Sequence, residues 1–182
     1  MQRWFTVMGL LLGMHGGMVT AEKSTEYLNN WPQWRGPLAS GVSPAGNPPG
    51  EWGETKNVMW KIAVPGKGHS TPVIWCNQVF ILTAVETDKE EVAGQTNAEA
   101  APARPGMPVT RTNKICKFVV MSLNRQDGKV LWQHTVKEEH PEDGLHPDFG
   151  SWASNSPVTD GEHVYAYFGS RGLYCFDMQG NL

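Results

Sequence analysis

The sequence contains few cysteines, only 3 in 182 residues: Cys76, Cys116 and Cys175. Because this is an odd number without a CxxC spacing, a zinc site built on cysteine is excluded and at most one internal disulfide can form. The sequence also has no P-loop, no dinucleotide-binding glycine fingerprint and no GxSxG elbow. Phosphoryl transfer and serine hydrolysis therefore lack support, and we assign no catalytic residues.

The sequence also lacks a charge excess of either sign. It has 15 basic and 18 acidic residues, a net charge of -3, and no basic block. A surface that binds nucleic acid needs clustered lysine and arginine, so we expect no nucleic-acid partner. The 20 glycines and 13 prolines predict frequent turns and few long helices, which makes a helical bundle an unsuitable fold.

The first 21 residues have the composition of a secretory signal peptide. Arg3 precedes an apolar stretch from Trp4 to about Leu12, and small residues follow up to a cleavage site after Ala21. The apolar stretch is too short to span a bilayer, which takes about 20 residues. No cysteine lies near the cleavage site, so a lipid anchor is not indicated. We expect an exported protein, periplasmic or extracellular, without a transmembrane span in the mature chain.

The rest of the chain contains an internal repeat. Four kinds of segment occur twice in the same order, and the repeated pairs are 58–61 with 130–133, 70–73 with 155–158, 77–81 with 162–166, and 118–124 with 172–177. Each is short, rich in Val, Ile, Tyr, Phe or Trp, and bounded by turn residues, which is typical of β-strands. The dipeptides Asp127-Gly128 and Asp160-Gly161 predict hairpin turns, since the type I′ turn needs positive φ.

This pattern predicts an all-β fold, a β-propeller of four-stranded antiparallel blades. The repeat unit of about 40 to 50 residues has the size of a propeller blade, and about two units are present. Two blades cannot close a ring, so we expect the chain to be the N-terminal part of a longer propeller.

Two segments fall outside the repeat. Residues 22–57 form an N-terminal extension rich in Trp, Pro and Gly. We expect this extension to cover a face or edge of the sheets, with the indole rings of Trp31, Trp34 and Trp52 packed against them. The partial propeller then spans residues 58–182. Within it, residues 86–114 have almost no large apolar side chain, which predicts a disordered insertion in a surface hairpin.

Segments 163–182 and 124–136 resemble the pyrroloquinoline-quinone-like repeat, in which a strand ending in Gly-Ser leads to a Leu-Tyr strand, a Gly turn and a Leu-Trp strand. The segment WPQWRGP at 31–37 is similar to an N-terminal motif of secreted bacterial proteins with this propeller. The resemblance implies about seven or eight blades, with Trp60 and Trp132 packed between adjacent blades. The family includes quinone-dependent alcohol and glucose dehydrogenases and the propeller lipoprotein of the outer-membrane β-barrel assembly machinery.

These observations favour an exported, non-catalytic scaffold that binds a protein or a cell-envelope component through its blade loops, such as residues 140–152. One alternative is the N-terminal part of a PQQ-dependent dehydrogenase, which would bind pyrroloquinoline quinone with calcium. The adjacent Cys-Cys pair that dehydrogenases of the family carry is missing here, so we expect no cofactor. The other alternative is a component of outer-membrane protein assembly.

One segment has the density of ligand residues that a metal site requires. The sequence HPEDGLHPD at 140–148 contains two histidines and three acidic residues, and imidazole and carboxylate both suit zinc or a similar ion. The ligands to test are His140, Asp143, His146 and Asp148. The alternative is a solvated loop between blades, which the two prolines and the irregular spacing favour.

Overall fold

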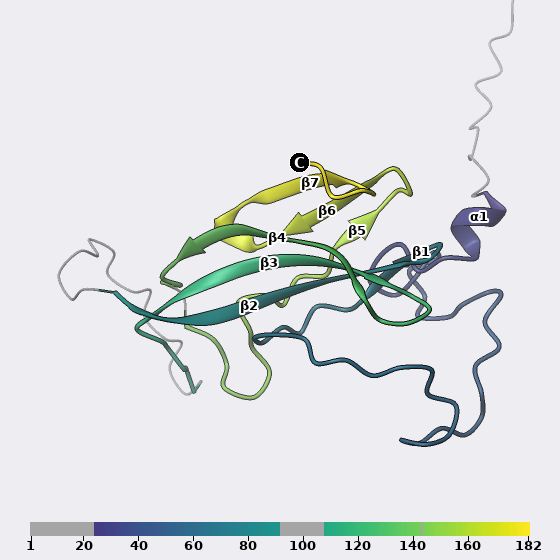
Figure 1. Cartoon of the computed structure of the whole chain (residues 1–182), viewed down its shortest axis with the longest axis horizontal. Helices are drawn as coiled ribbons and strands as arrows, with labels where there is room; N and C mark the ends of the chain where they lie inside the picture. Colours follow the sequence, from purple (N-terminus) through teal and green to yellow (C-terminus); the bar gives the residue numbers. More distant parts are fainter. Residues whose placement is uncertain (1–23, 92–107, 143) are drawn as a thin grey trace, which may run out of the picture.

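The computed structural model describes residues 24–91, 108–142 and 144–182, and these form two antiparallel β-sheets (Figure 1). The predicted signal peptide, residues 1–21, lies outside the described residues. Only two helical segments occur in the described part, the helix α1 (Thr25–Leu28) and the 3-10 helix η1 (Gly169–Arg171). Neither approaches the length and hydrophobicity of a membrane-spanning helix.

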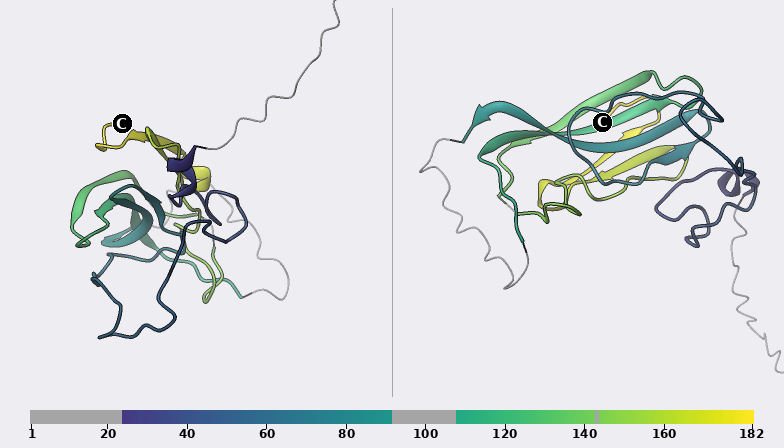
Figure 2. Two further views of the ribbon diagram at one scale, coloured as in Figure 1. Left: turned by 90° about the vertical axis from the view of Figure 1, so that its right-hand side faces the viewer. Right: turned by 90° about the horizontal axis from the view of Figure 1, so that it is seen from below.

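The first sheet contains four strands in sequence order, which are β1 (Val73–Trp75), β2 (Gln78–Glu90), β3 (Lys114–Asn124) and β4 (Val130–Glu139). The described part of the second sheet contains three, which are β5 (Val158–Thr159), β6 (His163–Tyr167) and β7 (Leu173–Asp177). The two sheets lie as layers, and β2 and β3 extend well beyond the second sheet (Figures 1 and 2). The first unit is therefore a complete four-stranded meander and the second has three of its strands.

The strand register confirms that the two sheets are copies of one unit. Gln78 pairs with Asn124 in the first sheet, and the equivalent His163 pairs with Asp177 in the second. The next residue pairs, Val79 with Leu123 and Val164 with Phe176, are equivalent in the same way. Since one residue of slip would turn every side chain to the opposite face, this agreement fixes which faces correspond in the two sheets.

The two central strands of the first sheet are buried on both faces over residues 79–84 of β2 and 118–123 of β3, which explains why these stretches are almost continuously apolar. Phe118 and Val120 of β3 face the second sheet and form one core with Phe168 and Phe176. The alternate positions of β3 face the other way, and the segment before β1 covers them through Ile62. A strand buried on both sides has no polar face, so its sequence does not alternate.

Trp132 joins the two sheets. Its ring lies 5.9 Å from Phe80 of the first sheet and 5.6 Å from Phe176 of the second, measured between centroids. Its indole N–H donates to the carbonyl of Met178 at 3.1 Å. A Cβ on Gly180, where φ is +90°, would lie 2.8 Å from the indole ring, so the turn after β7 comes this close only because residue 180 is glycine.

Trp60 repeats this contact one unit earlier. Its indole N–H donates to the carbonyl of Arg125 at 2.7 Å, and a Cβ on Gly128 would lie 2.6 Å from its ring. Each of these two tryptophans therefore packs on the glycine turn of the sheet that follows it along the chain. The predicted packing between adjacent units is observed for Trp132, while Trp60 packs on the first sheet alone among the described residues.

Two details of the predicted strands and of the predicted insertion differ from the structure. Residues 58–61 resemble the start of β4 in sequence, but they do not form a strand. β4 pairs with β3, whereas no strand lies beside residues 58–61 among the described residues. The prediction of disorder over residues 86–114 is wrong at both ends of this segment, since β2 continues to Glu90, β3 begins at Lys114, and the N–H of Glu91 donates to Asn113 at 2.8 Å. Residues 92–107 lie outside the described part.

The turns at Asp127-Gly128 and Asp160-Gly161 are present, but they are not type I′. Only the glycines have positive φ, at 73° and 98°. In the first turn the N–H of Gly128 reaches back to the carbonyl of Asn124, so the loop contains more than two residues. Aspartate does not need to adopt the left-handed conformation when a longer turn leaves that conformation to glycine alone.

The N-terminal extension covers the edge of β1. Trp31 exchanges two backbone hydrogen bonds with Ile74, at 3.0 and 2.8 Å, and the carbonyl of Pro32 accepts from Thr159 of β5. The extension thus contacts both sheets. The prediction that all three of its tryptophans pack is wrong for Trp34 and Trp52, which are 63% and 70% exposed.

Candidate functional site

His140, the first predicted metal ligand, follows directly after β4 and uses both of its ring nitrogens. Its Nε2 lies 2.7 Å from the carbonyl oxygen of Thr112, and its Nδ1 lies 2.8 Å from a carboxylate oxygen of Glu91. The side chains of His140 and Glu91 are mostly buried, with exposed fractions of 19% and 24%. To bind a metal, His140 would have to give up one of these contacts.

His146 and Asp148 are organised as a turn. The Nδ1 atom of His146 accepts hydrogen bonds from the N–H groups of Asp148 and Phe149, at 3.2 and 3.3 Å. Asp143 lies outside the described residues. In the described part of the chain, no group of three or more His, Cys, Asp or Glu side chains is placed to hold a metal ion. The structure therefore does not bring His140, His146 and Asp148 together as ligands.

His140 instead borders a polar cavity of about 370 Å³ between the ends of the two sheets. The guanidinium of Arg171, from η1, lies 4.8 Å above the ring of Phe118, and its Nε is 3.5 Å from Glu139. Sequence reasoning missed Glu91 and Arg171, because each meets its partner across 30 or more residues of chain and no local spacing marks the contact. The cavity is lined by Glu91, Glu139, His140, Glu142, Ser170 and Arg171.

The loop from His140 to Pro157, here called the β4–β5 loop, is held in place at several points. Leu145 exchanges two backbone hydrogen bonds with Thr110, at 2.8 and 3.0 Å. The ammonium group of Lys67 donates to the carbonyl of Pro147 at 3.2 Å. The N–H of His69 lies within hydrogen-bond distance of both Ser151 Oγ and the carbonyl of Ala153, which is buried. These tethers come from two other segments of the chain, so the loop has a defined shape.

Phe149 is the most exposed aromatic side chain on this loop, with 79% of its surface accessible. Its ring stacks on the imidazole of His146 with centroids 4.8 Å apart. Because the backbone N–H of Phe149 also donates to that imidazole, the ring projects from a fixed position. An exposed aromatic group with little conformational freedom left to lose is typical of a contact that anchors a protein interface.

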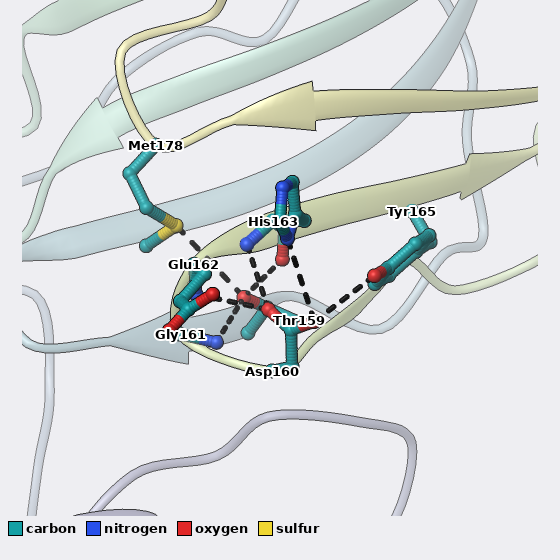
Figure 3. Close-up of polar contacts among 7 residues, drawn as sticks. All are labelled: Thr159, Asp160, Gly161, Glu162, His163, Tyr165 and Met178. Atoms are coloured by element: carbon teal, nitrogen blue, oxygen red, sulfur yellow. Dashed lines mark hydrogen bonds and ion pairs between the residues drawn. The ribbon is translucent and has the colours of Figure 1, made fainter.

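The β5–β6 turn contains a dense set of polar contacts that serve the fold (Figure 3). The carboxylate of Asp160 accepts from the backbone N–H groups of Glu162 and His163, at 2.9 and 2.7 Å, and from the hydroxyl of Tyr165 at 2.9 Å. Partial desolvation acts to raise the pKa of Asp160, but these hydrogen bonds together outweigh it and lower the pKa. Asp160 thus closes the hairpin as an ionised turn residue.

The three cysteines are all free thiols. Cys76 and Cys175 are exposed, and Cys116 is buried in the core between the sheets. Burial, assisted by the negative charge of Glu86, raises the pKa of Cys116 to about 11, although Arg171 acts in the opposite direction. Cys116 is therefore a packing residue without nucleophilic character at neutral pH.

The described residues contain no arranged calcium site. Calcium takes six to eight oxygen ligands, which a cluster of carboxylates usually provides, and no cluster of this kind is placed for a metal in the described part of the chain. A second cavity, of about 240 Å³, is lined by residues without charge, among them Gly66, Gly68 and Ser70.

Comparison with known proteins identifies one family. The family model described as outer membrane protein assembly factor BamB, a PQQ-like repeat, matches residues 51–182. The match covers both sheets and the segment that packs Trp60 and Ile62 onto the first sheet. No curated protein and no solved structure matches the chain.

Proposed function

Because the chain belongs to the PQQ-like repeat family described as outer membrane protein assembly factor BamB, we propose that it is an exported β-propeller scaffold that binds a protein of the cell envelope. The family implies that the two sheets are blades of a propeller. The partner would contact the β4–β5 loop, with Phe149 as the central anchor. Export to the periplasm or the extracellular space rests on the signal-like sequence of residues 1–21.

The exposure of Phe149 on a tethered loop is the observation that carries this proposal. A large aromatic ring that is 79% exposed makes no contribution to the core, while its hydrogen-bonded backbone keeps it from folding back. Binding to such a ring buries apolar surface without a large entropy cost, because the loop is already ordered.

The description of the family favours outer-membrane protein assembly as the setting for this binding. An assembly factor works through protein contacts, which agrees with an exposed aromatic anchor on an ordered loop. The PQQ-dependent dehydrogenase stays a prediction of the sequence resemblance alone. No further observation favours it.

Site-specific photo-crosslinking tests the proposal. A photoreactive amino acid at position 149, introduced into the protein in its native cells, is expected to form a covalent product with an envelope protein that mass spectrometry identifies. The affinity of the purified pair is then measured for Phe149→Ala. We expect the dissociation constant to rise at least tenfold, as for a hot spot worth about 2 kcal/mol.

Leu131→Ala is the matched control, because Leu131 is also exposed, at 47%, but lies on β4 away from the loop. We expect its affinity to equal that of the wild-type protein. Equal affinity of Phe149→Ala and the wild type, or a crosslink at position 131 and none at 149, would exclude the loop as the contact surface. Neither substitution removes a buried side chain, so both variants should keep the stability of the wild type.

A further inference from the structure

We propose that residues 58–62 of a second copy of this protein add to the outer edge of β7 as a fourth strand, so that copies join head to tail. The first sheet has the order β1-β2-β3-β4, whereas β7 pairs only with β6 among the described strands. Residues 58–61 have the sequence pattern of the start of β4 but form no strand. The chain thus carries both an incomplete sheet and a segment of the kind that completes it.

One row of side chains across the first sheet defines the position that this strand would fill. Val73, Phe80, Ser122 and Trp132 pair in succession from β1 to β4, so their side chains lie on the same face. The first three are fully buried where the second sheet packs on this face. Because Ser122 is small, the ring of Trp132 reaches across it to Phe80, at 5.9 Å between centroids.

The equivalent row of the second sheet stops after three members in the described part of the chain. These are Val158, Tyr165 and Cys175, which are paired in the same register from β5 to β7. Val158 and Cys175 are exposed, although their counterparts in the first sheet are fully buried. Tyr165 places an aromatic ring where Phe80 has one, and Cys175 is again a small residue. By comparison with the first row, the fourth member is a tryptophan.

Trp60 is the tryptophan whose surroundings match those of Trp132. Its indole N–H donates to the carbonyl of Arg125, the residue after β3, just as Trp132 donates to Met178, the residue after β7. Its ring also packs on the glycine turn at Gly128. Trp132 lies between two sheets, whereas Trp60 lies on one in the described part. A second sheet placed beside Trp60 would therefore repeat an interface that the fold already contains.

Residues 58–62 cannot complete the second sheet of their own chain. Ile62 packs with Val119 and Met121, on the face of the first sheet that points away from the second. The row that ends at Cys175 faces outward on the other side of the two layers, because the alternate residue Phe176 faces the first sheet. The contact thus joins unlike surfaces of two copies. Each added copy presents the accepting surface again, so assembly does not stop at a dimer.

Sedimentation equilibrium of the purified protein over about a hundredfold range of concentration tests the inference. We expect the average mass to rise with concentration and to exceed that of a dimer. A mass that stays at one copy or levels off at two would overturn the proposal, since contact between two like faces stops at two.

The exposed thiols report on the contact itself. By the register of the first sheet, Trp60 of the second copy lies opposite Cys175, as Trp132 lies opposite Ser122. The reaction of Cys175 with a thiol reagent should therefore slow by roughly fivefold when most of the protein is associated. Cys76, which is exposed in the turn between β1 and β2, should keep its rate. Unchanged rates of both thiols in the associated protein would refute this arrangement.

Leu173→Glu separates this contact from other kinds of self-association. Leu173 belongs to the same outer face and is 64% exposed, so the substitution leaves the core of a single copy intact. In the joined copies its counterpart position, Val120, is fully buried, and burial of a charge there should weaken association at least about tenfold. Val42→Glu is the matched control, because it adds the same charge at a position of equal exposure on the N-terminal extension.

We expect Val42→Glu to associate as the wild type does. Equal association of Leu173→Glu and the wild type would exclude the outer face of the second sheet as the contact. These experiments use the purified protein alone, so their outcome is independent of the envelope partner proposed for Phe149.

Discussion

Replacement of Trp132 by alanine is expected to weaken the packing between the two sheets and so to lower the free energy of unfolding. Removal of a large aromatic side chain from a packed core costs about 3 to 5 kcal/mol. Because Trp132 is only half buried, we expect the lower end of this range, about 3 kcal/mol, including about 1 kcal/mol for the hydrogen bond to Met178. This is a large share of the 5 to 15 kcal/mol that stabilises a typical domain.

The variant Trp132→Phe separates the contribution of the ring packing from that of the hydrogen bond. Phenylalanine keeps a ring between Phe80 and Phe176 but leaves the carbonyl of Met178 without its indole donor. We expect a loss of about 1 to 2 kcal/mol. The measurement is urea unfolding followed by circular dichroism, with the free energy obtained by linear extrapolation. Trp34→Ala is the matched control, because this tryptophan is 63% exposed and its removal should change stability by less than about 0.5 kcal/mol.

The reasoning fails if Trp132→Ala costs less than about 1 kcal/mol, or as little as Trp34→Ala. Either result would mean that the sheets are held together by the apolar core alone and that the tryptophan is a surface group resting on the glycine turn.

Three further predictions concern the turns and the core. Since the pKa of Asp160 is lowered in the folded protein, its contribution to stability is present above the ordinary carboxyl pKa of about 4 and is lost as the pH falls through the lower folded value. Asp160→Asn should flatten this acid dependence in unfolding experiments from pH 2 to 6, because the amide oxygen still accepts both backbone N–H groups. Only Cys76 and Cys175 should react with a thiol reagent at pH 8 in the native protein, since Cys116 is buried with a pKa of about 11, and a third thiol reacting before unfolding would contradict this. Gly180→Ala should cost about 1 to 3 kcal/mol of stability, because its Cβ would lie 2.8 Å from the ring of Trp132.

The order and type of the strands could be predicted from the sequence because both units carry the same local signals. Short runs rich in Val, Ile and aromatic residues end at Asp-Gly or Gln-Gly, and the resulting strand registers agree between the sheets. Residues 58–61 show the limit of this approach. They have the sequence of β4, but a strand forms only beside a partner edge, and the described residues provide none.

The surroundings of the candidate site could not be predicted for a related reason. The ligand-like residues of the β4–β5 loop are close in sequence, yet His140 turns toward Glu91 and His146 toward its own turn. Which partner a polar side chain meets depends on where the strand ends meet, and β2 and β4 end at the same corner only after the meander has formed. Local composition identified His140 as a polar residue of interest without showing its role.

Because each tryptophan contacts the next glycine turn along the chain, the group of residues that stabilise one another does not coincide with a single sheet. Trp132 belongs to the last strand of the first sheet by hydrogen bonding, but its ring is completed by residues 176–180 of the second. In a nearest-neighbour description of repeat stability, part of the intrinsic energy of one unit thus appears in the coupling term to the following unit. If the chain were divided after β4, Trp132 would lie on one piece and its contacts at residues 176–180 on the other. An excised unit should therefore begin with the strand that carries the tryptophan and end with the glycine turn that this tryptophan contacts.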